Sequence, residues 1–270
     1  MQDRPWTLNQ LKKLGICIRD QADILEGLPE YDEVMSWYND LALEVQSRIM
    51  ALPWATIMPD RAVEVTSRPK TIDTLRQKLQ RDHATPLPSI QDIAGVRVEA
   101  DMNLDEQDLV VSDIVAAFPD GAPLIKDLRV GPHSGYRAVH VWLKLPSGRA
   151  EIQVRTHIQG AWANMYEAAG DRLGRDIRYG SIPSVPEAAQ LVLALQDLSI
   201  NTAALIESTR TELDRREIQD MSRTGSHKSS SSRSARVRGR RGLRRQFKAQ
   251  ELKFKAGIED LREMFYSLTD

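Results

Sequence analysis

Apolar residues recur at helical spacing in two stretches near the start of the chain. The weaker set is Leu8, Leu11, Leu14 and Ile18, and the stronger set is Val34, Trp37, Leu41, Val45 and Ile49. Steps of three and four residues place each set on one side of a helix. The sequence therefore predicts two packing helices within residues 1–58, with Cys17 as a small core residue.

A third helix is predicted from about Pro69 to Arg81. Pro53 and Pro59 end the preceding pattern, and Thr66 and Ser67 are side chains of the type that cap helices. Ile72, Leu75 and Leu79 form its apolar face. A separate basic face is predicted to contain Lys70, Thr74, Lys78 and Arg81.

The pattern changes to alternation after residue 90, which is typical of strands. Short β-branched or alternating runs occur at Ile93–Val98, Ile125–Val130, Gly135–Leu145 and Arg149–Thr156, and Asp108–Phe118 has helical periodicity between them. A turn at 146–148 joins the last two runs into a hairpin. One face of its second strand is apolar, and the other contains Glu151, Gln153 and Arg155.

Helical periodicity returns at His157 and continues through Pro186 to Asp214. Residues 221–246 are rich in Ser, Arg and Gly and are interpreted as a basic flexible linker. Apolar positions recur again over 247–270, as expected of an amphipathic helix that folds back on the protein or binds a partner. The expected divisions are 1–58, 59–180 for a catalytic core, 181–220, 221–246 and 247–270.

The net charge of −1 conceals an uneven distribution. Ten Lys or Arg and no Asp or Glu lie between Arg223 and Lys248, so the remaining residues carry about −11. Such a basic segment suits polyanions, although a solubilising linker would have the same composition. The sequence predicts no membrane-spanning run and no signal peptide, hence a cytoplasmic protein without membrane insertion. A single cysteine excludes an internal disulfide and a thiolate metal cluster.

Two carboxylates stand at positions that suit metal-assisted phosphoryl transfer. Asp92 immediately precedes a predicted strand, and Glu151 lies among apolar and cationic residues of another. Carboxylates can hold Mg²⁺, and the basic helix face can neutralise a triphosphate. Surface acids and a solvated helix face are the simpler interpretations of these features. The sequence contains no Gly-rich loop ending in Gly-Lys-Ser/Thr, so a nucleotide would be held by side chains.

Four sequence blocks in order resemble the RelA/SpoT synthetase domain, and in particular small alarmone synthetases. They are Arg68-Pro-Lys70 with Lys78 and Arg81; Asp92-Ile-Ala-Gly-Val-Arg97; Gly135-Tyr136-Arg137 with His140; and Glu151-Ile-Gln-Val-Arg-Thr156 followed by Trp162-Ala163. The expected fold is α+β, with a mixed sheet of about five strands flanked by helices, as in nucleotidyltransferase-like synthetases, and with helical extensions at both ends.

The resemblance implies a Mg²⁺-dependent pyrophosphokinase that uses ATP. Arg68 and Arg97 would enclose the adenine, and Lys70, Lys78 and Arg81 would hold the phosphates. Asp92 and Glu151 would bind Mg²⁺, with Glu151 activating the acceptor hydroxyl. Tyr136 would stack on the acceptor base, and His140, Gln153 and Arg155 would position the acceptor.

The acceptor side departs from the family pattern. Residues 131–134 read Gly-Pro-His-Ser where a Pro-Lys pair is usual, and Tyr166-Glu167 replaces a Glu-His pair. The resemblance to a toxic, tRNA-targeting branch then implies the tRNA 3′-CCA end as acceptor, with growth arrest and a neutralising antitoxin. The alternatives are synthesis of (p)ppGpp or ppApp, and a catalytically degenerate RNA- or partner-binding protein. A homo-oligomer is possible under each hypothesis. No His-Asp pair is present, so no hydrolase activity is expected.

Overall fold

The computed structural model describes residues 3–131, 134–222 and 230–267. They divide into two compact units that differ from the expected divisions. Unit 1 comprises residues 1–101, 108–127 and 139–155, and unit 2 comprises 102–107, 128–138 and 156–270. The N-terminal helices thus belong to the same unit as the sheet rather than forming a subdomain of their own.

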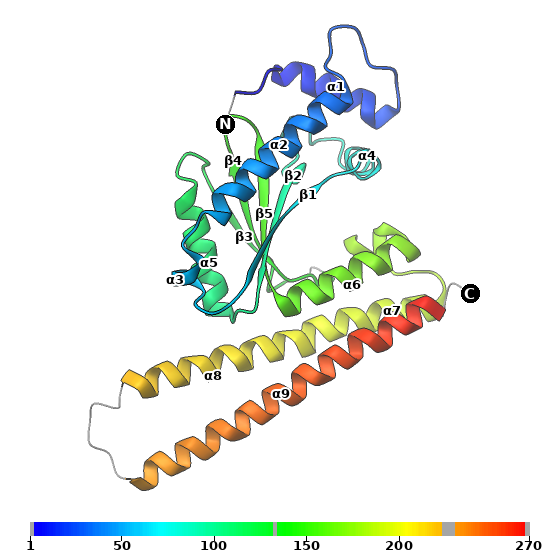
Figure 1. The fold of residues 1–270 in the computed structure, drawn as a ribbon. Helices are drawn as coiled ribbons and strands as arrows, with labels where there is room; N and C mark the ends of the chain where they lie inside the picture. Colours follow the sequence, from blue (N-terminus) through cyan, green and yellow to red (C-terminus); the bar gives the residue numbers. More distant parts are fainter. Residues whose placement is uncertain (1–2, 132–133, 223–229, 268–270) are drawn as a thin grey trace. The chain divides into compact units, whose positions relative to one another are not determined.

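Unit 1 is built on a five-stranded sheet with the order β1-β2-β5-β4-β3 (Figure 1). The strands are β1 (Val63–Pro69), β2 (Ala94–Ala100), β3 (Leu124–Asp127), β4 (Val139–Lys144) and β5 (Arg149–Thr156). β1 pairs antiparallel with β2, and β4 pairs antiparallel with both β3 and β5. This confirms the expected α+β class with a mixed sheet of about five strands.

Helices of unit 1 pack on this sheet and on each other. They are α1 (Leu8–Asp20), α2 (Tyr31–Met50), α3 (Trp54–Ile57), α4 (Ile72–Arg81), the short 3₁₀ turn η1 (Leu87–Ser89) and most of α5 (Leu104–Ala117). α2 lies against β1 and β2, while α1 packs on α4 and η1 (Figure 1). The two N-terminal helices predicted from periodicity are confirmed, and Cys17 is buried as expected.

The prediction for the start of the third helix, at residues 66–71, is wrong. Val63–Pro69 is a strand, whereas the sequence predicted capping residues and the start of a helix. α4 begins at Ile72, and its N-cap is Thr71, whose hydroxyl accepts from the Thr74 amide. Strand pairing decided the outcome, because seven residues of β1 align with β2 from Val63↔Ala100 to Pro69↔Ala94. Lys70 therefore precedes α4 instead of lying on its basic face.

The predicted hairpin is confirmed, although its first strand is shorter than predicted. The first strand of the hairpin, β4, begins at Val139 rather than at Gly135. The strand before the hairpin, β3, ends at Asp127 rather than at Val130. Cross-strand pairing sets His140 opposite Gln153 and Trp142 opposite Glu151. The polar residues of both strands consequently share one face, as the alternation predicted.

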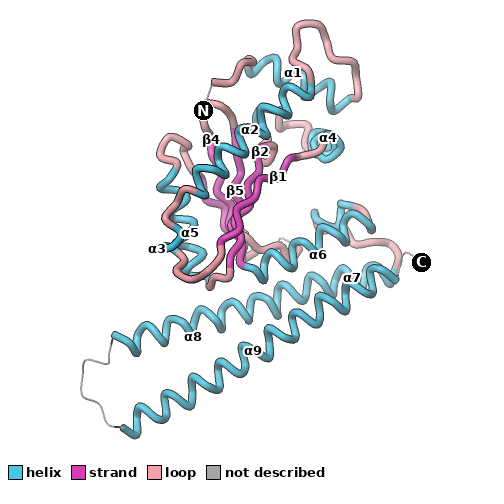
Figure 2. The backbone as a smooth tube through the Cα atoms, in the orientation of Figure 1, coloured by secondary structure: helices cyan, strands magenta, loops and turns pink. Residues whose placement is uncertain are grey.

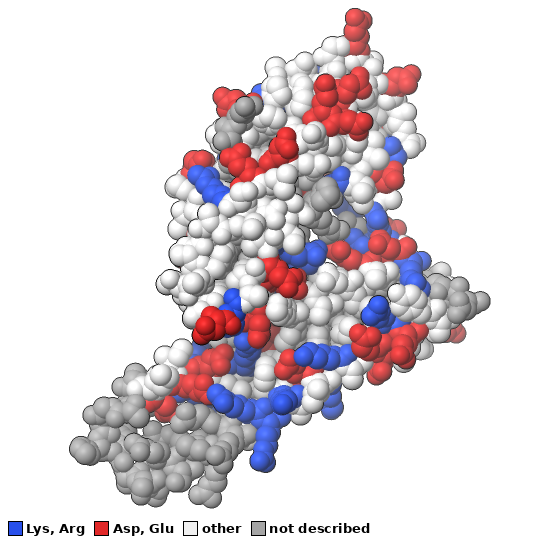
Figure 3. Space-filling model, viewed as in Figure 1, with Lys and Arg blue, Asp and Glu red and all other residues white. Residues whose placement is uncertain are grey.

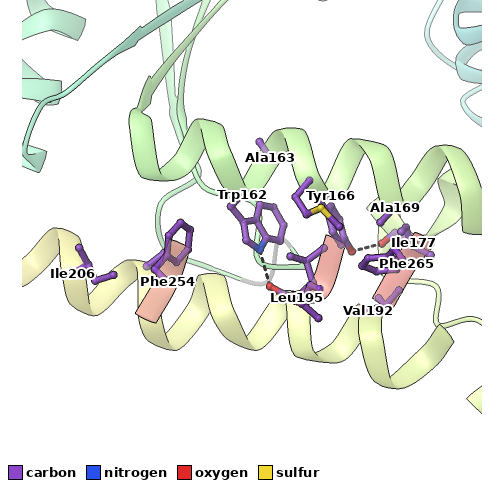
Figure 4. Close-up of a cluster of buried hydrophobic side chains, with 13 residues drawn as sticks. Trp162, Ala163, Tyr166, Ala169, Ile177, Val192, Leu195, Ile206, Phe254 and Phe265 are labelled. Atoms are coloured by element: carbon purple, nitrogen blue, oxygen red, sulfur yellow. Dashed lines mark hydrogen bonds between the residues drawn. The ribbon is translucent and has the colours of Figure 1, made fainter. Parts of the chain in front are cut away.

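Unit 2 is helical and is built around one apolar cluster. Its helices are α6 (His157–Leu173), the 3₁₀ turn η2 (Arg175–Tyr179), α7 (Pro186–Asp197), the π-helix η3 (Leu198–Ala203), α8 (Ala204–Ser222) and α9 (Ser230–Ser267). Figure 2 shows α9 running back along α8 and α7. Trp162 stacks on Tyr166 within the cluster, and Phe254 and Phe265 of α9 are buried in it (Figure 4).

The C-terminal segment differs in part from its prediction. The backbone of residues 230–246 is helical, where the sequence predicts a flexible linker, and 223–229 lie outside the described residues. The amphipathic helix folds back onto unit 2, which was one of the two outcomes expected for it.

The run from α7 through η3 to α8 is long and apolar enough to cross a membrane, by length and composition alone. Only 28% of its most apolar window is buried. Val192, Leu195 and Ile206 of this run nevertheless pack in the apolar cluster of unit 2. Core helices of water-soluble proteins pass the same test, so the run is weak evidence for a membrane span.

Candidate functional site

Asp92 lies between two lysines at the amino end of β2. Lys70 Nζ is 2.5 Å from Oδ2 of Asp92, and Lys78 Nζ is 2.6 Å from Oδ1. Lys70 comes from the link between β1 and α4, and Lys78 comes from α4 itself. Three sequence-predicted site residues are therefore brought together, although Lys70 reaches the site from a different element than predicted.

The lysines control the ionisation of the carboxyl group. Burial raises the pKa of Asp92, but the charges and hydrogen bonds of Lys70 and Lys78 outweigh it and lower the pKa to about 2. Burial lowers the pKa of Lys70, an effect that Asp92 only partly offsets. With this low pKa Asp92 is an anion at neutral pH, and the two lysines that contact it make a partly buried carboxylate tolerable.

Glu151 lies on the polar face of β5 and is hydrogen-bonded through both carboxylate oxygens. Its Oε1 accepts from Trp142 Nε1 at 2.9 Å and lies 3.1 Å from His140 Nδ1. Its Oε2 accepts from Gln153 Nε2 at 2.8 Å, and Arg155 Nη2 in turn donates to Gln153 Oε1 at 2.7 Å. The structure thus brings Glu151, His140, Gln153 and Arg155 into one network, in which Glu151, His140 and Arg155 are buried and Gln153 is half-buried.

The two candidate carboxylates interact electrostatically. Burial and the negative charge of Asp92 raise the pKa of Glu151, but its contacts with His140 and Gln153 outweigh them, so that the pKa lies below its ordinary value. The charge of Lys70 also acts on Glu151 as well as on Asp92. Adjacent β2 and β5 therefore place Asp92 and Glu151 in one electrostatic site.

The donor set of this site fits a hard cation. Asp92 and Glu151 supply carboxylate oxygens, which Mg²⁺ prefers, and substrate phosphates and water usually complete its shell. Within residues 3–131, 134–222 and 230–267, three or more His, Cys, Asp or Glu residues do not gather into a metal site.

The other residues that the sequence predicted to bind ATP are Arg68, Arg81 and Arg97. Arg97 is half-buried on β2, opposite Thr66 of β1. Arg81 is exposed at the last position of α4. The backbone of Arg68 pairs with Gly95 in the sheet, and its side chain lies outside the described residues.

Tyr136 lies before β4 rather than on that strand. It is half-buried and packs against the apolar cluster of unit 2. The preceding Gly135 has φ +85°, and a Cβ at this position would lie 2.8 Å from the Trp162 ring and 3.2 Å from the Gln196 backbone. Only glycine fits this turn, which explains the Gly-Tyr pair in physical terms.

Sequence reasoning missed Glu207, a buried acid of α8. Its carboxylate is 3% exposed and is hydrogen-bonded to Arg137, which adjoins Tyr136, and to Thr156 at the end of β5. A signal was available, because Glu207 and Thr211 follow Ala203 at intervals of four and share its helix face. An acid on the apolar, buried face of a helix indicates a hydrogen-bonding or cationic partner that is buried with it.

Comparison with known proteins agrees with this geometry. Residues 67–170 match the region found in RelA/SpoT proteins. Proteins of Mycobacterium tuberculosis and Mycobacterium bovis, both described as uncharacterised, are 47% identical over 194 residues, which is 72% of this chain and 70% of theirs.

Similar solved structures include three synthetase-like proteins. Small alarmone synthetase 1 of Bacillus subtilis has a TM-score of 0.53 at 24% identity, covering 70% of this chain and 98% of that one. Small alarmone synthetase 2 of the same organism has 0.55 at 20%, covering 70% and 100%. A GTP pyrophosphokinase family protein of Streptococcus pneumoniae has 0.53 at 24%, covering 71% and 95%. At these identities the likeness establishes the fold.

The matched region contains the end of β1, all of β2, β3, β4 and β5, and the Asp92 and Glu151 site. Three findings point to the same family: the match of residues 67–170, the 47% identity to mycobacterial relatives over 72% of this chain, and the fold shared with the synthetases. The chain belongs to the RelA/SpoT family.

Proposed function

We propose that the protein is a Mg²⁺-dependent pyrophosphokinase that transfers pyrophosphate from ATP to a ribose 3′-hydroxyl. The observation that carries the proposal is the pairing of Asp92, held by Lys70 and Lys78, with Glu151 in one electrostatic site. Carboxylates beside phosphate-binding cations are what metal-assisted phosphoryl transfer requires.

The reaction is a displacement at the β-phosphorus of ATP. The 3′-oxygen forms a bond to that phosphorus, the bond from the β-phosphorus to the oxygen that bridges to the α-phosphate breaks, and AMP leaves. The hydroxyl proton passes to Glu151, which is ionised because its pKa is lowered. His140 and Gln153 hold both oxygens of Glu151 in place, so that little reorganisation is needed during the transfer.

Asp92 and Glu151 would hold Mg²⁺, which when bound neutralises charge on the phosphate oxygens. Lys70 and Lys78 would contact the phosphates together with Arg81, and Arg68 and Arg97 would enclose the adenine. For Lys70 and Lys78 this role requires that phosphate oxygens replace the oxygens of Asp92 as their partners.

We favour the 3′-CCA end of tRNA as acceptor, with Tyr136 stacking on a base and Gln153, Arg155 and His140 positioning the ribose. The absence of a lysine in Gly131-Pro132-His133-Ser134 supports an acceptor without a 5′-phosphate pocket at this point. The ten basic residues between 223 and 248 support binding of an RNA backbone. The protein would then arrest growth from the cytoplasm and would require a neutralising antitoxin.

A second candidate acceptor is a guanine or adenine nucleotide. It is supported by the likeness to Bacillus subtilis small alarmone synthetase 1, a structure of which is bound to its product pppGpp, with a TM-score of 0.50 at 23% identity over 73% of this chain and 98% of that one. Another structure of that protein is bound to AMPCPP. Transfer to either acceptor would use the same proposed ATP site.

Transfer of label from γ-³²P ATP to GDP, GTP or bulk tRNA separates the acceptors. We expect labelled tRNA with AMP released in equal amount, and strong dependence of the rate on salt. Label in nucleotide alone would rule out tRNA and support the alarmone hypothesis. Absence of label from every acceptor would instead support a catalytically degenerate binding protein.

Glu151→Gln tests the chemical step. The amide keeps the shape of the side chain but cannot accept the proton, so we expect the rate of label transfer to fall by about 10² to 10⁴. Glu64→Gln, at an exposed position of β1, is the matched control and should transfer label like the parent. A Glu151→Gln protein as active as the parent would refute the proposal.

A further inference from the structure

Glu207 receives hydrogen bonds from two segments of unit 2, one that contains Arg137 and one that contains Thr156 and Gln159. Its Oε2 accepts from Nη2 and Nε of Arg137, at 2.7 and 3.2 Å. Its Oε1 accepts from Thr156 Oγ1 at 2.7 Å and from Gln159 Nε2 at 2.8 Å. Both carboxylate oxygens are thus engaged, within the interior of unit 2.

The first segment contains the residue proposed to stack on the acceptor base. Arg137 directly follows Tyr136 in the chain, and it also donates to the carbonyl of Arg129. The guanidinium group therefore links Arg129 and Arg137, at the two ends of the loop before β4, and it connects this loop to Glu207 of α8. A planar guanidinium held by two of its nitrogens fixes orientation as well as position.

The second segment continues from the strand that contains Glu151, Gln153 and Arg155. Thr156 is the last residue of β5 and the N-cap of α6, and its hydroxyl accepts from the Gln159 amide at 3.1 Å while donating to Glu207. Gln159 also receives a hydrogen bond from Gln107 at 2.8 Å. Glu207 consequently anchors Thr156, the residue that joins β5 to α6.

A second tether reaches the same loop from the π-helix. Ser199 Oγ donates to the Gly135 carbonyl at 2.5 Å, and Trp162, which contacts Gly135, donates to the Leu195 carbonyl at 2.6 Å. π-Helices are rare and commonly occur at functional positions. Here η3 brings a hydroxyl of the C-terminal helices to the residue before Tyr136.

We infer that Glu207 and Ser199 are positioning residues for the acceptor, because they hold the Gly135-Tyr136-Arg137 segment in place from helices that lie outside the matched region 67–170. The inference rests on the proposed function, in which Tyr136 contacts the acceptor. A buried ion pair contributes little stability compared with apolar packing, so geometry is the more direct consequence of this one.

The test combines kinetics with amide hydrogen exchange on the full chain. For Glu207→Gln we expect the KM for the acceptor, measured with bulk tRNA and with GDP, to rise about 10- to 100-fold, while the KM for ATP stays within about twofold. Exchange at residues 134–138 should become faster, with α4 unchanged. Ser199→Ala should act in the same direction with a smaller effect.

Two further variants control the experiment. Arg137→Gln should raise the acceptor KM in the same direction as Glu207→Gln, and the two effects should be less than additive in the double variant, because both changes remove the Arg137–Glu207 ion pair. Glu207→Gln also perturbs the contacts with Thr156 and Gln159. Asp105→Asn breaks an exposed ion pair between Asp105 of α5 and Arg215, which lies on α8 like Glu207. This variant should leave both KM values and the exchange of 134–138 unchanged.

The outcomes separate this inference from the proposed function. Equal rises in both KM values, or unchanged exchange at 134–138, would overturn the positioning role. If the parent transfers label to no acceptor, the proposed function fails, and the exchange measurement decides only the structural part of the inference: faster exchange in Glu207→Gln shows that Glu207 holds residues 134–138 in place, and unchanged exchange refutes it.

Discussion

Two lysines stabilise the carboxylate of Asp92 at the candidate site. A partly buried carboxylate is costly unless cations compensate it, and Lys70 and Lys78 each contact one of its oxygens. The same lysines are the proposed phosphate ligands, so a bound nucleotide would exchange one anion for another.

A single glycine sets the path of the loop before β4. Gly135→Ala should destabilise unit 2 by about 1–3 kcal/mol, because the new Cβ would adopt a positive φ and meet the Trp162 ring and the Gln196 backbone. Urea unfolding of the full chain measures this effect.

Gly174→Ala is the matched control, because Gly174 has φ +100° in the same unit but no atom within 4 Å of a Cβ. The difference between the two variants isolates the steric contact from the backbone strain. Equal destabilisation by both would show that the contact with Trp162 contributes nothing.

At the scale of elements, β1 decides the geometry of the donor side. Val63–Pro69 pairs along its full length with β2, and this brings Lys70 to Asp92 from outside α4. Local sequence around Thr66 and Ser67 suited a helix start equally well. Hydrogen bonds to a partner some thirty residues away in sequence outweighed that local preference.

The junction of β5 and α6 is a second decisive element. Thr156→Val should lower the free energy of unfolding by about 2 kcal/mol, because it removes the N-cap hydrogen bond of α6 and leaves Glu207 with one donor fewer. Thermal and urea unfolding measure the loss.

Thr156→Ser keeps the hydroxyl and should stay within about 0.5 kcal/mol of the parent. If Val and Ser variants were equally stable, the capping interaction would have no net value.

At the scale of the molecule, α9 completes the core of unit 2. Phe254 and Phe265 lie in the cluster with Trp162 and Tyr166 (Figure 4). Leu261 belongs to the same cluster, and Tyr136 packs against it. In Figure 3 acidic side chains gather over α2 and the loop that precedes it, and charges of both signs mix over α8 and α9. The long C-terminal helix thus combines an apolar packing face with a charged outer face.

Phe254→Ala should destabilise the protein by about 3–5 kcal/mol, because it removes a fully buried ring and leaves a cavity. Leu252→Ala, two residues earlier and 61% exposed, should change stability by less than about 0.5 kcal/mol. Denaturant unfolding compares the two. A Phe254→Ala protein as stable as Leu252→Ala would show that α9 does not contribute to the core.

The sequence by itself determined the elements whose signal is local. Periodicity identified α1, α2 and the amphipathic part of α9, and strict alternation identified β5 and which of its residues share the polar face. These patterns are readable because a helix or strand imposes its own repeat on buried positions. Motif order likewise indicated the RelA/SpoT family.

Only the tertiary structure decided which distant residues meet. β1 exists because β2 is available to pair with it, Lys70 and Lys78 converge on Asp92 from two elements, and Glu207 reaches Arg137 across seventy positions of sequence. Such contacts depend on how elements pack, and the chain contains no local repeat that encodes them. The paired carboxylates could be proposed from the sequence, but the network that holds them required the fold.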